Sequence, residues 1–254
     1  MYAEERHQAI AELVASRGRV AVTELARHFD VTTETVRRDL SQLEKLKLLR
    51  RVHGGAVSMR SVTMLEARLD DRDQVNADEK ERIAQAAVAL LPEGGGTLLL
   101  DAGSTTARLA ARLPAGDHWT VITHAVPIAA MLAPLPNVEL HLLPGRVRTA
   151  THAAVGNATV EAIGQLRADL AFVGTNGIST RHGLSTPDPE EAATKRAIVA
   201  AGERVVVLAD ATKVGQERTV RFAALEDVDV LVTDDIDTAD AKAFEAAGLE
   251  VVRA

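Results

Sequence analysis

The chain has 254 residues, of which 46% are hydrophobic and 26% charged, so it is long enough for two compact domains and apolar enough to bury a core. It has no cysteine, which excludes disulfides and thiolate metal sites, and its eight histidines show no metal-ligand spacing, so we expect neither metal nor cofactor. No apolar run is long enough to span a bilayer, and the first residues are acidic where a signal peptide needs an apolar core; we therefore expect a cytoplasmic protein with no membrane partner.

Charge is distributed unevenly along the chain. Residues 1–60 carry 11 Lys and Arg against 8 Asp and Glu, a net +3, whereas residues 61–254 carry 18 against 28, a net −10. Within the first part, residues 33–60 hold 7 basic and 3 acidic residues. Because an acidic body repels nucleic acid, a small basic module attached to it indicates a separate interaction with an anionic partner.

The first thirty residues predict two helices. Ile10, Leu13 and Val14 give the first helix an apolar face that ends before Gly18, and residues 23–29 predict a second, shorter helix. A third helix follows the second almost at once.

A third helix is predicted to begin after Thr32, whose hydroxyl suits an N-cap position. At about 100° per residue, Val36 and Leu40 fall on one side of this helix, whereas Arg37 and Arg38 fall on the other. Two helices joined by a tight turn, the second with a basic outer face, predict a helix-turn-helix whose outer face enters the major groove of DNA.

Residues 48–57 predict a β-hairpin, because the Gly54–Gly55 pair allows the positive φ angles of a tight turn. A basic hairpin after a helix-turn-helix is a wing. An exposed Arg-Arg pair taken alone is more simply a solvated helix face, but the succession of short helix, turn, capped basic helix and Gly-Gly hairpin favours binding of double-stranded operator DNA. The predicted DNA-binding residues are Thr32, Thr33, Glu34, Thr35, Arg37, Arg38, Ser41, Arg50, Arg51, His53, Gly54 and Gly55.

The remaining sequence predicts a second domain of a different class. We assign residues 1–59 to the winged helix-turn-helix domain, residues 60–78 to a polar, charge-rich linker and residues 79–254 to an effector domain. In the last of these, seven apolar segments such as TLLLD and RVVVLAD alternate with Ala-rich helical segments. Near-continuous apolar strands separated by helices predict a doubly wound α/β domain with a parallel sheet covered on both faces.

Polar residues follow five successive predicted strands, just beyond their carboxyl ends. Ligands of open α/β sheets bind in the crevice outside these ends, so the five loops are predicted to converge on one pocket. The predicted effector-binding residues are Asp101, Gly103, Ser104, Thr105, Thr106, Thr123, His124, Gly145, Arg146, Asn176, Gly177, Glu191, Lys195, Asp210 and Lys213.

The chemistry of this set indicates a phosphorylated sugar. Residues 104–106 lie at the start of a predicted helix, where free N–H groups and the helix dipole stabilise an anion. Arg146, Lys195 and Lys213 add positive charge, and the carboxylates and Asn176 supply partners for hydroxyl groups. Taken one at a time, these residues are equally typical of helix caps and turns. Neither a Walker motif nor GxGxxG follows a strand, which disfavours a nucleotide.

These motifs resemble those of the DeoR family of bacterial transcription regulators. VTTETVRRDLSQLEKLKLLRRVHGGA is similar to the family's N-terminal signature, and DAGSTT, VGTNGIS, EEAATKRAIV and VLADATKVG occupy the places of its effector-domain motifs, so the resemblance covers residues 1–254. It implies a non-catalytic regulator, most often a repressor. It also implies an effector domain similar to the ribose-5-phosphate isomerase and CoA-transferase folds, which senses phosphorylated sugars or polyols through the loop at 101–106 and the two lysines, Lys195 and Lys213.

Two positions depart from the family pattern. Asn176 stands where many members have Asp, and His124 stands where Asn is common. VGTNGIS together with GLSTPD is most similar to the branch that controls fructose utilisation, which implies fructose 1-phosphate as the effector.

Two hypotheses about function remain from the sequence. One is a DNA-binding regulator of a sugar catabolic operon; the other is a sugar-phosphate isomerase-like enzyme with an appended DNA-binding arm, in which Asp101, Glu191 or Asp210 is the base. Because helix-turn-helix proteins usually bind paired half-sites as dimers, we also expect a homo-oligomer, a dimer or tetramer, with most of the interface on the acidic domain.

Overall fold

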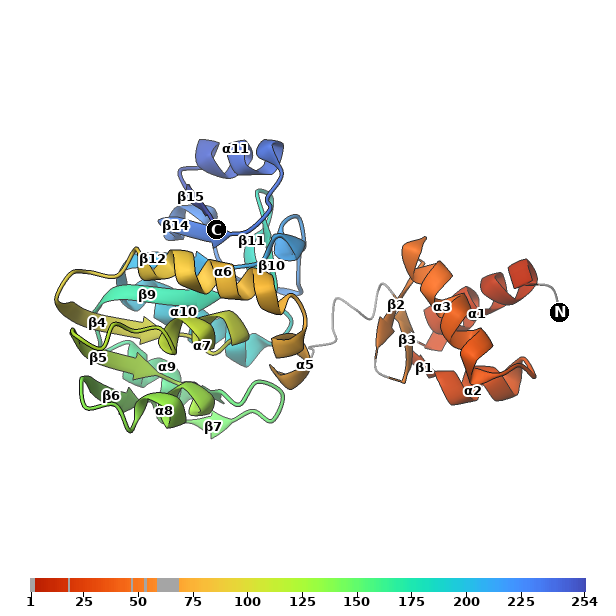
Figure 1. Ribbon diagram of the computed structural model, residues 1–254, viewed down its shortest axis with the longest axis horizontal. Coiled ribbons are helices and arrows are strands. Elements are labelled where there is room, and N and C mark those ends of the chain that lie inside the picture. Colours follow the sequence, from red (N-terminus) through yellow and green to blue (C-terminus); the bar gives the residue numbers. More distant parts are fainter. Residues whose placement is uncertain (1–2, 18, 47, 53, 59–68) are drawn as a thin grey trace. The chain divides into compact units, whose positions relative to one another are not determined.

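The computed structural model describes residues 3–17, 19–46, 48–52, 54–58 and 69–254. The chain forms two compact units, Met1–Glu66 and Ala67–Ala254 (Figure 1). In the part of the chain that the structure describes, no helix has the length and apolar character needed to cross a membrane.

The first unit contains the three predicted helices and the predicted hairpin. Its elements are α1 (Ala3–Arg17), β1 (Arg19–Ala21), α2 (Val22–His28), α3 (Thr33–Lys45), β2 (Leu49–Val52) and β3 (Gly55–Ser58). The sequence did not predict β1, because three residues are too few to show a period; β1 pairs with β3 and completes a sheet of order β1-β3-β2. Ile10, Leu25, Leu40 and Leu49 are buried in the core between the helices and this sheet.

The two glycines of the wing have different roles. Gly54 has φ +78° in the turn, as predicted, whereas Gly55 does not have a positive φ. A Cβ atom at Gly55 would lie 2.2 Å from the carbonyl oxygen of Val20, so this position needs glycine because β1 and β3 approach closely there. The turn is further fixed by the Val22 N–H, which donates to the Gly54 carbonyl at 2.8 Å.

A buried ion pair joins α1 to α3. The Asp39 carboxylate accepts from Arg6 Nε at 2.6 Å, and its other oxygen lies 2.9 Å from His7 Nε2. Burial alone would raise the pKa of Asp39, but hydrogen bonds from Arg6 and His7 more than offset it and hold this pKa below its usual value. Asp39 lies on the inner face of α3, beside Leu40 and Leu43, where an unpaired charge would be costly.

Replacing Asp39 by Asn should lower the free energy of unfolding of the first unit by about 3 kcal/mol, because it leaves the Arg6 guanidinium buried without its counter-charge. Since the folded state lowers the pKa of Asp39, the stabilisation is present above the unfolded pKa of about 3.9 and is lost as pH falls below it, so the difference between variant and wild type should shrink there. Urea unfolding followed by circular dichroism measures the loss, and hydrogen exchange in α1 and α3 assigns it to this unit. Glu12→Gln on α1 is the matched control; an equal loss in both variants would contradict the assignment.

The second unit is built on a seven-stranded parallel sheet of order β15-β14-β12-β9-β4-β5-β6. Its strands are β4 (Gly95–Leu100), β5 (His118–Thr123), β6 (Val138–Leu142), β9 (Ala168–Gly174), β12 (Gly202–Leu208), β14 (Val230–Thr233) and β15 (Glu250–Arg253). All seven predicted strands are present, and the doubly wound α/β class is confirmed.

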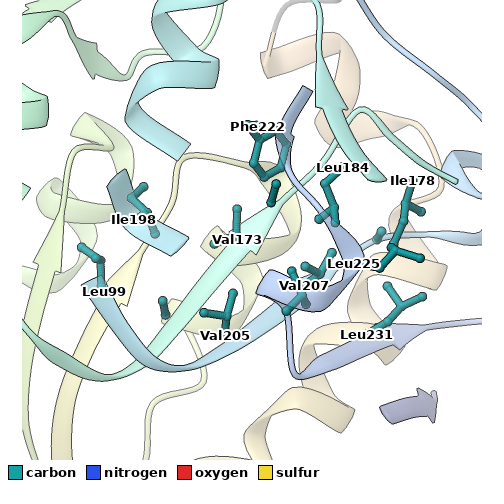
Figure 2. Packing of buried hydrophobic residues seen from close by; sticks show 14 of the residues in the cluster. Leu99, Val173, Ile178, Leu184, Ile198, Val205, Val207, Phe222, Leu225 and Leu231 are labelled. Atoms are coloured by element: carbon teal, nitrogen blue, oxygen red, sulfur yellow. The ribbon is translucent and has the colours of Figure 1, made fainter. Parts of the chain in front are cut away.

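Helices cover both faces of this sheet. One face packs against α6 (Ala77–Val88), α7 (Ser104–Ala110) and α8 (Val126–Leu132). The other packs against α9 (Asn157–Ile163), α10 (Pro189–Ala201) and α11 (Thr238–Ala246). On this second face, Phe222, Leu184 and Ile178 gather beside Val173 and Val207 of the sheet (Figure 2).

Two small antiparallel elements were not predicted. One is a hairpin of β7 (Arg146–Val147) and β8 (Ala154–Val155); the other is a sheet of order β10-β11-β13, formed by Gly177–Ser179, Gly183–Thr186 and Val220–Ala223. Their strands have only two to four residues, and β13 comes from a distant part of the chain. Local periodicity therefore carries no signal for them.

The segment expected as a linker, residues 60–78, differs from the expectation in its second half. Residues 59–68 lie outside the described residues, but α5 (Leu69–Gln74) is helical and belongs to the second unit, where the Leu69 N–H donates to the Ala150 carbonyl at 2.8 Å. The charge-rich composition that suggested a linker is equally that of a short helix with an exposed face.

Candidate DNA-binding face and candidate effector site

The outer face of α3 presents its polar residues as the sequence predicted. Thr32 caps the helix by accepting the Thr35 N–H at 3.1 Å. Glu34, Arg37 and Arg38 are exposed. Arg37 lies 3.3 Å from Glu34, an exposed pair that contributes little to stability, whereas Arg38 has no side-chain partner among the described residues.

The wing is held against α3 by hydrogen bonds of Arg51 on β2. The Arg51 backbone N–H donates to the Glu44 carboxylate at 2.8 Å, and its guanidinium donates to Ser41 Oγ at 2.6 Å. Ser41 in turn donates to the Arg37 carbonyl at 2.8 Å. Ser41, predicted to contact DNA, is therefore already engaged in positioning the wing.

A concave pocket of about 360 Å³ lies where α2, α3 and the wing meet. It is lined by Val22, Thr23, Thr33, Arg37, Arg51, Val52, Gly54 and Gly55. The structure therefore brings two predicted cations, one predicted threonine and both wing glycines to one hollow. Of the other predicted residues, Arg50 lies in β2 opposite Val57, and His53 lies outside the described residues.

The centre of the candidate effector site is Asp101, which follows β4 and is completely buried. Its Oδ2 accepts the Gly174 N–H at 2.8 Å and the Lys195 ammonium, and its Oδ1 lies 3.1 Å from His124 Nε2. Gly174 ends β9, the neighbour of β4 on the side where the strand order reverses. Asp101 thus lies at the switch point of the sheet, where ligands of such folds bind.

The partners of Asp101 keep it ionised. Burial alone would raise its pKa, but the positive charge of Lys195 and the contact with His124 hold this pKa well below the usual range. Lys195 is itself buried and also donates to the Gly174 carbonyl at 3.0 Å. Asp101 thus organises the strand ends through Oδ2, and its predicted contact with a sugar hydroxyl stays a prediction.

His124 joins three segments. Its Nε2 accepts the Ala102 N–H at 3.0 Å, and its Nδ1 lies within hydrogen-bond distance, 2.8 Å, of the Ala154 carbonyl on β8. The two ring nitrogens of His124 thus contact different segments, and this is the structural role of the histidine that departs from the family pattern. The preceding residue, Thr123, donates to the Leu100 carbonyl at 2.7 Å, so it also joins β5 to β4.

Ser104, Thr105 and Thr106 form the first turn of α7 and are buried. Thr106 donates to the Gly103 carbonyl at 3.0 Å, and Arg108, which the sequence did not single out, donates to the Ser104 carbonyl at 3.1 Å. The predicted anion site at this turn therefore has a guanidinium attached to it.

The loop after β6 differs from the prediction. Arg146 is exposed and pairs with Glu190, whereas Arg148 is mostly buried, pairs with Glu191 and lies 3.0 Å from Asp188. Glu191 is therefore the partner of an arginine. The sequence features that could have indicated these ion pairs are the i, i+2 spacing of the two arginines and the acidic run at 188–191. Position 145 requires glycine because of close packing: its φ is +145°, and an added Cβ atom would lie 2.2 Å from Thr159 Oγ1.

The remaining predicted residues lie at the ends of β9 and β12. Asp210 caps the turn η1 (Ala211–Lys213) and accepts from Asn76 Nδ2 at 3.1 Å; burial alone would raise its pKa, but Lys213, 3.6 Å away, and the hydrogen bonds more than offset it. Asn176 accepts from Thr186 Oγ1 at 3.0 Å, and the Gly177 N–H lies 3.3 Å from Thr175 Oγ1. Lys213 and Asn176 are the partly exposed members of the set.

Comparison with known proteins gives matches along the whole chain. Residues 6–62 match the DeoR-like helix-turn-helix domain and residues 75–235 match the DeoR C-terminal sensor domain. The chain is 35% identical to the uncharacterized HTH-type transcriptional regulator FruR of Bacillus subtilis, over 92% of each protein. It is 36% identical to the HTH-type transcriptional regulator GlpR of Haloferax volcanii, over 98% of this chain and 96% of that protein.

Two further matches extend the comparison. The glycerol-3-phosphate regulon repressor of Escherichia coli is 33% identical over 91% of this chain and 90% of its own length. Ribose 5-phosphate isomerase A from Methanocaldococcus jannaschii matches 55% of each chain with 18% identity and a TM-score of 0.40, which is too low to carry a conclusion about this chain.

A winged helix-turn-helix joined to a doubly wound sensor domain defines the chain as a DNA-binding transcription regulator. It belongs to the DeoR family, as the resemblance in its motifs implied. The relatives are named regulators and repressors, so the regulator hypothesis holds and the isomerase hypothesis is set aside.

Replacing Lys195 by Met should lower the unfolding free energy of the second unit by about 3–5 kcal/mol, because it leaves the buried Asp101 carboxylate without its cation. Adding Asp101→Asn should recover much of this loss. Fluorescence of Trp119, the one tryptophan, follows urea unfolding of this unit. Lys242→Met, at an exposed site, is the control. If the double variant lost as much unfolding free energy as the two single variants lose in sum, Lys195 and Asp101 would not be coupled.

Proposed function

We propose that the chain represses a sugar catabolic operon: the first unit binds double-stranded operator DNA through α3 and the wing, and the second binds a phosphorylated sugar that weakens this binding. The observation that carries the DNA half is the placement of Arg37 and Arg51 around one hollow, with Arg38 exposed beside it. A helix that enters the major groove reads bases, while wing cations hold the phosphate backbone.

Arg38 is the best candidate for reading a base, because it has no side-chain partner among the described residues and keeps its donors for DNA. Arg37 and Arg51 border the hollow and suit phosphate oxygens, and Arg50 and His53 are assigned to the backbone with them. The relatives are named transcriptional regulators. We propose that this chain acts in the cytoplasm as a homo-oligomer that binds paired half-sites.

Changing Arg38 to Ala should weaken operator binding by about 1–3 kcal/mol and relax the preference at one base position. Changing Arg37 to Ala should weaken binding to all sequences and flatten the dependence on salt. Gel-shift titrations with a duplex selected from a random library measure both, and Arg27→Ala, exposed on α2, is the control. Unchanged affinity of the double variants Arg37/Arg38 and Arg50/Arg51 would reject the assignment.

The effector half rests on the polar groups around the switch point. The first turn of α7 and the partly exposed Lys213 suit a phosphate dianion, and Asn176 with the engaged carboxylates of Glu191 and Asp210 suits hydroxyl groups. Fructose 1-phosphate is the first candidate, from the resemblance of the VGTNGIS and GLSTPD motifs. Glycerol 3-phosphate is the second, because it appears in the name of a relative.

Lys213→Ala should abolish the response to the effector and leave ligand-free operator binding unchanged, because Lys213 lies in the second unit and supplies charge to the dianion. A thermal-shift panel of fructose 1-phosphate, glycerol 3-phosphate and the free sugars identifies the ligand, which at 100 times its Kd adds roughly 2.7 kcal/mol of stability. Operator titrations with and without that ligand then test wild type, Lys213→Ala and the control Lys242→Ala. A variant that still releases DNA at the wild-type ligand concentration would remove Lys213 from the site.

A further inference from the structure

Residues 69–76, which precede α6, are fixed to the second unit at both ends. We call residues 69–76 the α5 segment. Its first N–H, from Leu69, donates to the Ala150 carbonyl in the β7–β8 loop at 2.8 Å. At its other end, the buried Lys80 ammonium of α6 donates to the Arg72 carbonyl and, at 2.5 Å, to the Val75 carbonyl. Lys80 thus holds the carboxyl end of α5, where helix carbonyls lack partners of their own.

Two further contacts join the α5 segment to loops of the candidate effector site. Arg108 Nη1 pairs with the Asp73 carboxylate and donates to the Ser104 carbonyl at 3.1 Å, while its Nη2 donates to the Asp73 carbonyl at 3.1 Å. Asn76 donates to Asp210 at 3.1 Å, and Asp210 lies 3.6 Å from Lys213. Arg108 therefore contacts both the α5 segment and Ser104, and Asp210 contacts both the α5 segment and Lys213. Ser104 and Lys213 are the proposed phosphate contacts.

The α5 segment is also the first described element after the winged unit. Ser58 ends β3 and Leu69 begins α5, so ten residues of chain separate these two elements. Any change in how α5 is held therefore occurs at the start of the second unit, next in sequence to the winged unit.

From these contacts we infer that the α5 segment carries the effector signal: occupancy of the site changes how Arg108 and Asp210 hold Asp73 and Asn76, and this change alters operator binding by the winged unit. This inference rests on the proposed function. A phosphate dianion near Ser104 and Lys213 competes with Asp73 for Arg108 and with Asp210 for Lys213, because each cation gains a second anionic partner. The ligand therefore has different contacts with the two arrangements of the segment, which is what a shift in population requires.

The charge on Lys80 responds to the same groups. Burial, the largest cause, and the positive charges of Lys213, Arg72 and Arg108 together lower the pKa of Lys80 to about 8, although the negative charge of Asp210 opposes them. A bound dianion offsets those positive charges and favours the protonated ammonium, which is the form that donates to the two α5 carbonyls. The anchor at the end of the segment is thus strengthened when the site is filled.

The test uses the double variant Asp73→Asn/Asn76→Gly in the full chain, with Asp71→Asn, exposed on the same helix, as the matched control. Glycine suits position 76 because Asn76 has φ +54°. Three quantities are measured: operator affinity without ligand, affinity for fructose 1-phosphate and for glycerol 3-phosphate, and the change that each ligand makes in operator affinity. Thermal unfolding shows that each variant is folded.

For wild type and Asp71→Asn we expect the effective ligand to weaken operator binding by about 5–150-fold, the usual range of such coupling. For the double variant we expect each partner still to bind alone, with the coupling reduced below about 2-fold. A purely structural role of these contacts would change thermal stability and both affinities but leave the coupling factor as in wild type, and that result would overturn the inference.

A second arm needs no effector. Hydrogen exchange of wild type with and without operator duplex should show changed protection in residues 69–80 and in residues 101–110, whereas in the double variant the change should stop before residue 101. If neither phosphate ester binds wild type, the proposed effector is wrong, while this arm still judges the segment. Unchanged protection of residues 69–80 in wild type on operator binding would refute the role of the α5 segment.

Discussion

The buried carboxylate of Asp101 is the interaction on which the second unit depends. It accepts from a lysine of α10 and from the backbone of β9, and it contacts the histidine that follows β5, so three parts of the chain meet at one negative charge. Such a charge is tolerated in the interior because Lys195 and the Gly174 N–H both donate to Oδ2; without Lys195 the buried charge would carry a large energetic penalty. The same arrangement fixes the loops at the carboxyl edge of the sheet, where a ligand of this fold class binds.

The first unit also contains a buried carboxylate that is paired with basic residues. Asp39 on the inner face of α3 is paired with Arg6 and His7 of α1, so the helix that presents Arg37 and Arg38 is anchored from behind. The wing is anchored from the side by Arg51, through Glu44 and Ser41. Basic groups on the outer face are thus held in place by hydrogen bonds that leave Arg38 available. A pre-positioned basic face reduces the entropy that binding to DNA must overcome.

Family membership and the departures from the family pattern are compatible. His124 reaches Ala102 on one side and Ala154 on the other, a span that joins the β4 and β8 ends of the site. Arg148 neutralises acids at the start of α10, the helix that carries Lys195. Side chains outside the recognised motifs therefore shape this edge of the sheet together with the motif residues.

The sequence by itself determined the three helices and the wing of the first unit, the seven strands of the parallel sheet and the edge at which polar residues gather, because each of these follows from periodicity, capping and turn chemistry within a short window. Only the tertiary structure decided which polar residues are open and which are engaged. Asp101 and Glu191, both predicted as ligand contacts, are buried and paired with Lys195 and Arg148, residues 94 and 43 positions away. Arg108, Lys80 and Asn76 carried no local signal, because their roles come from contacts with α5 and Asp210 that form only when distant strand ends are brought to one edge of the sheet.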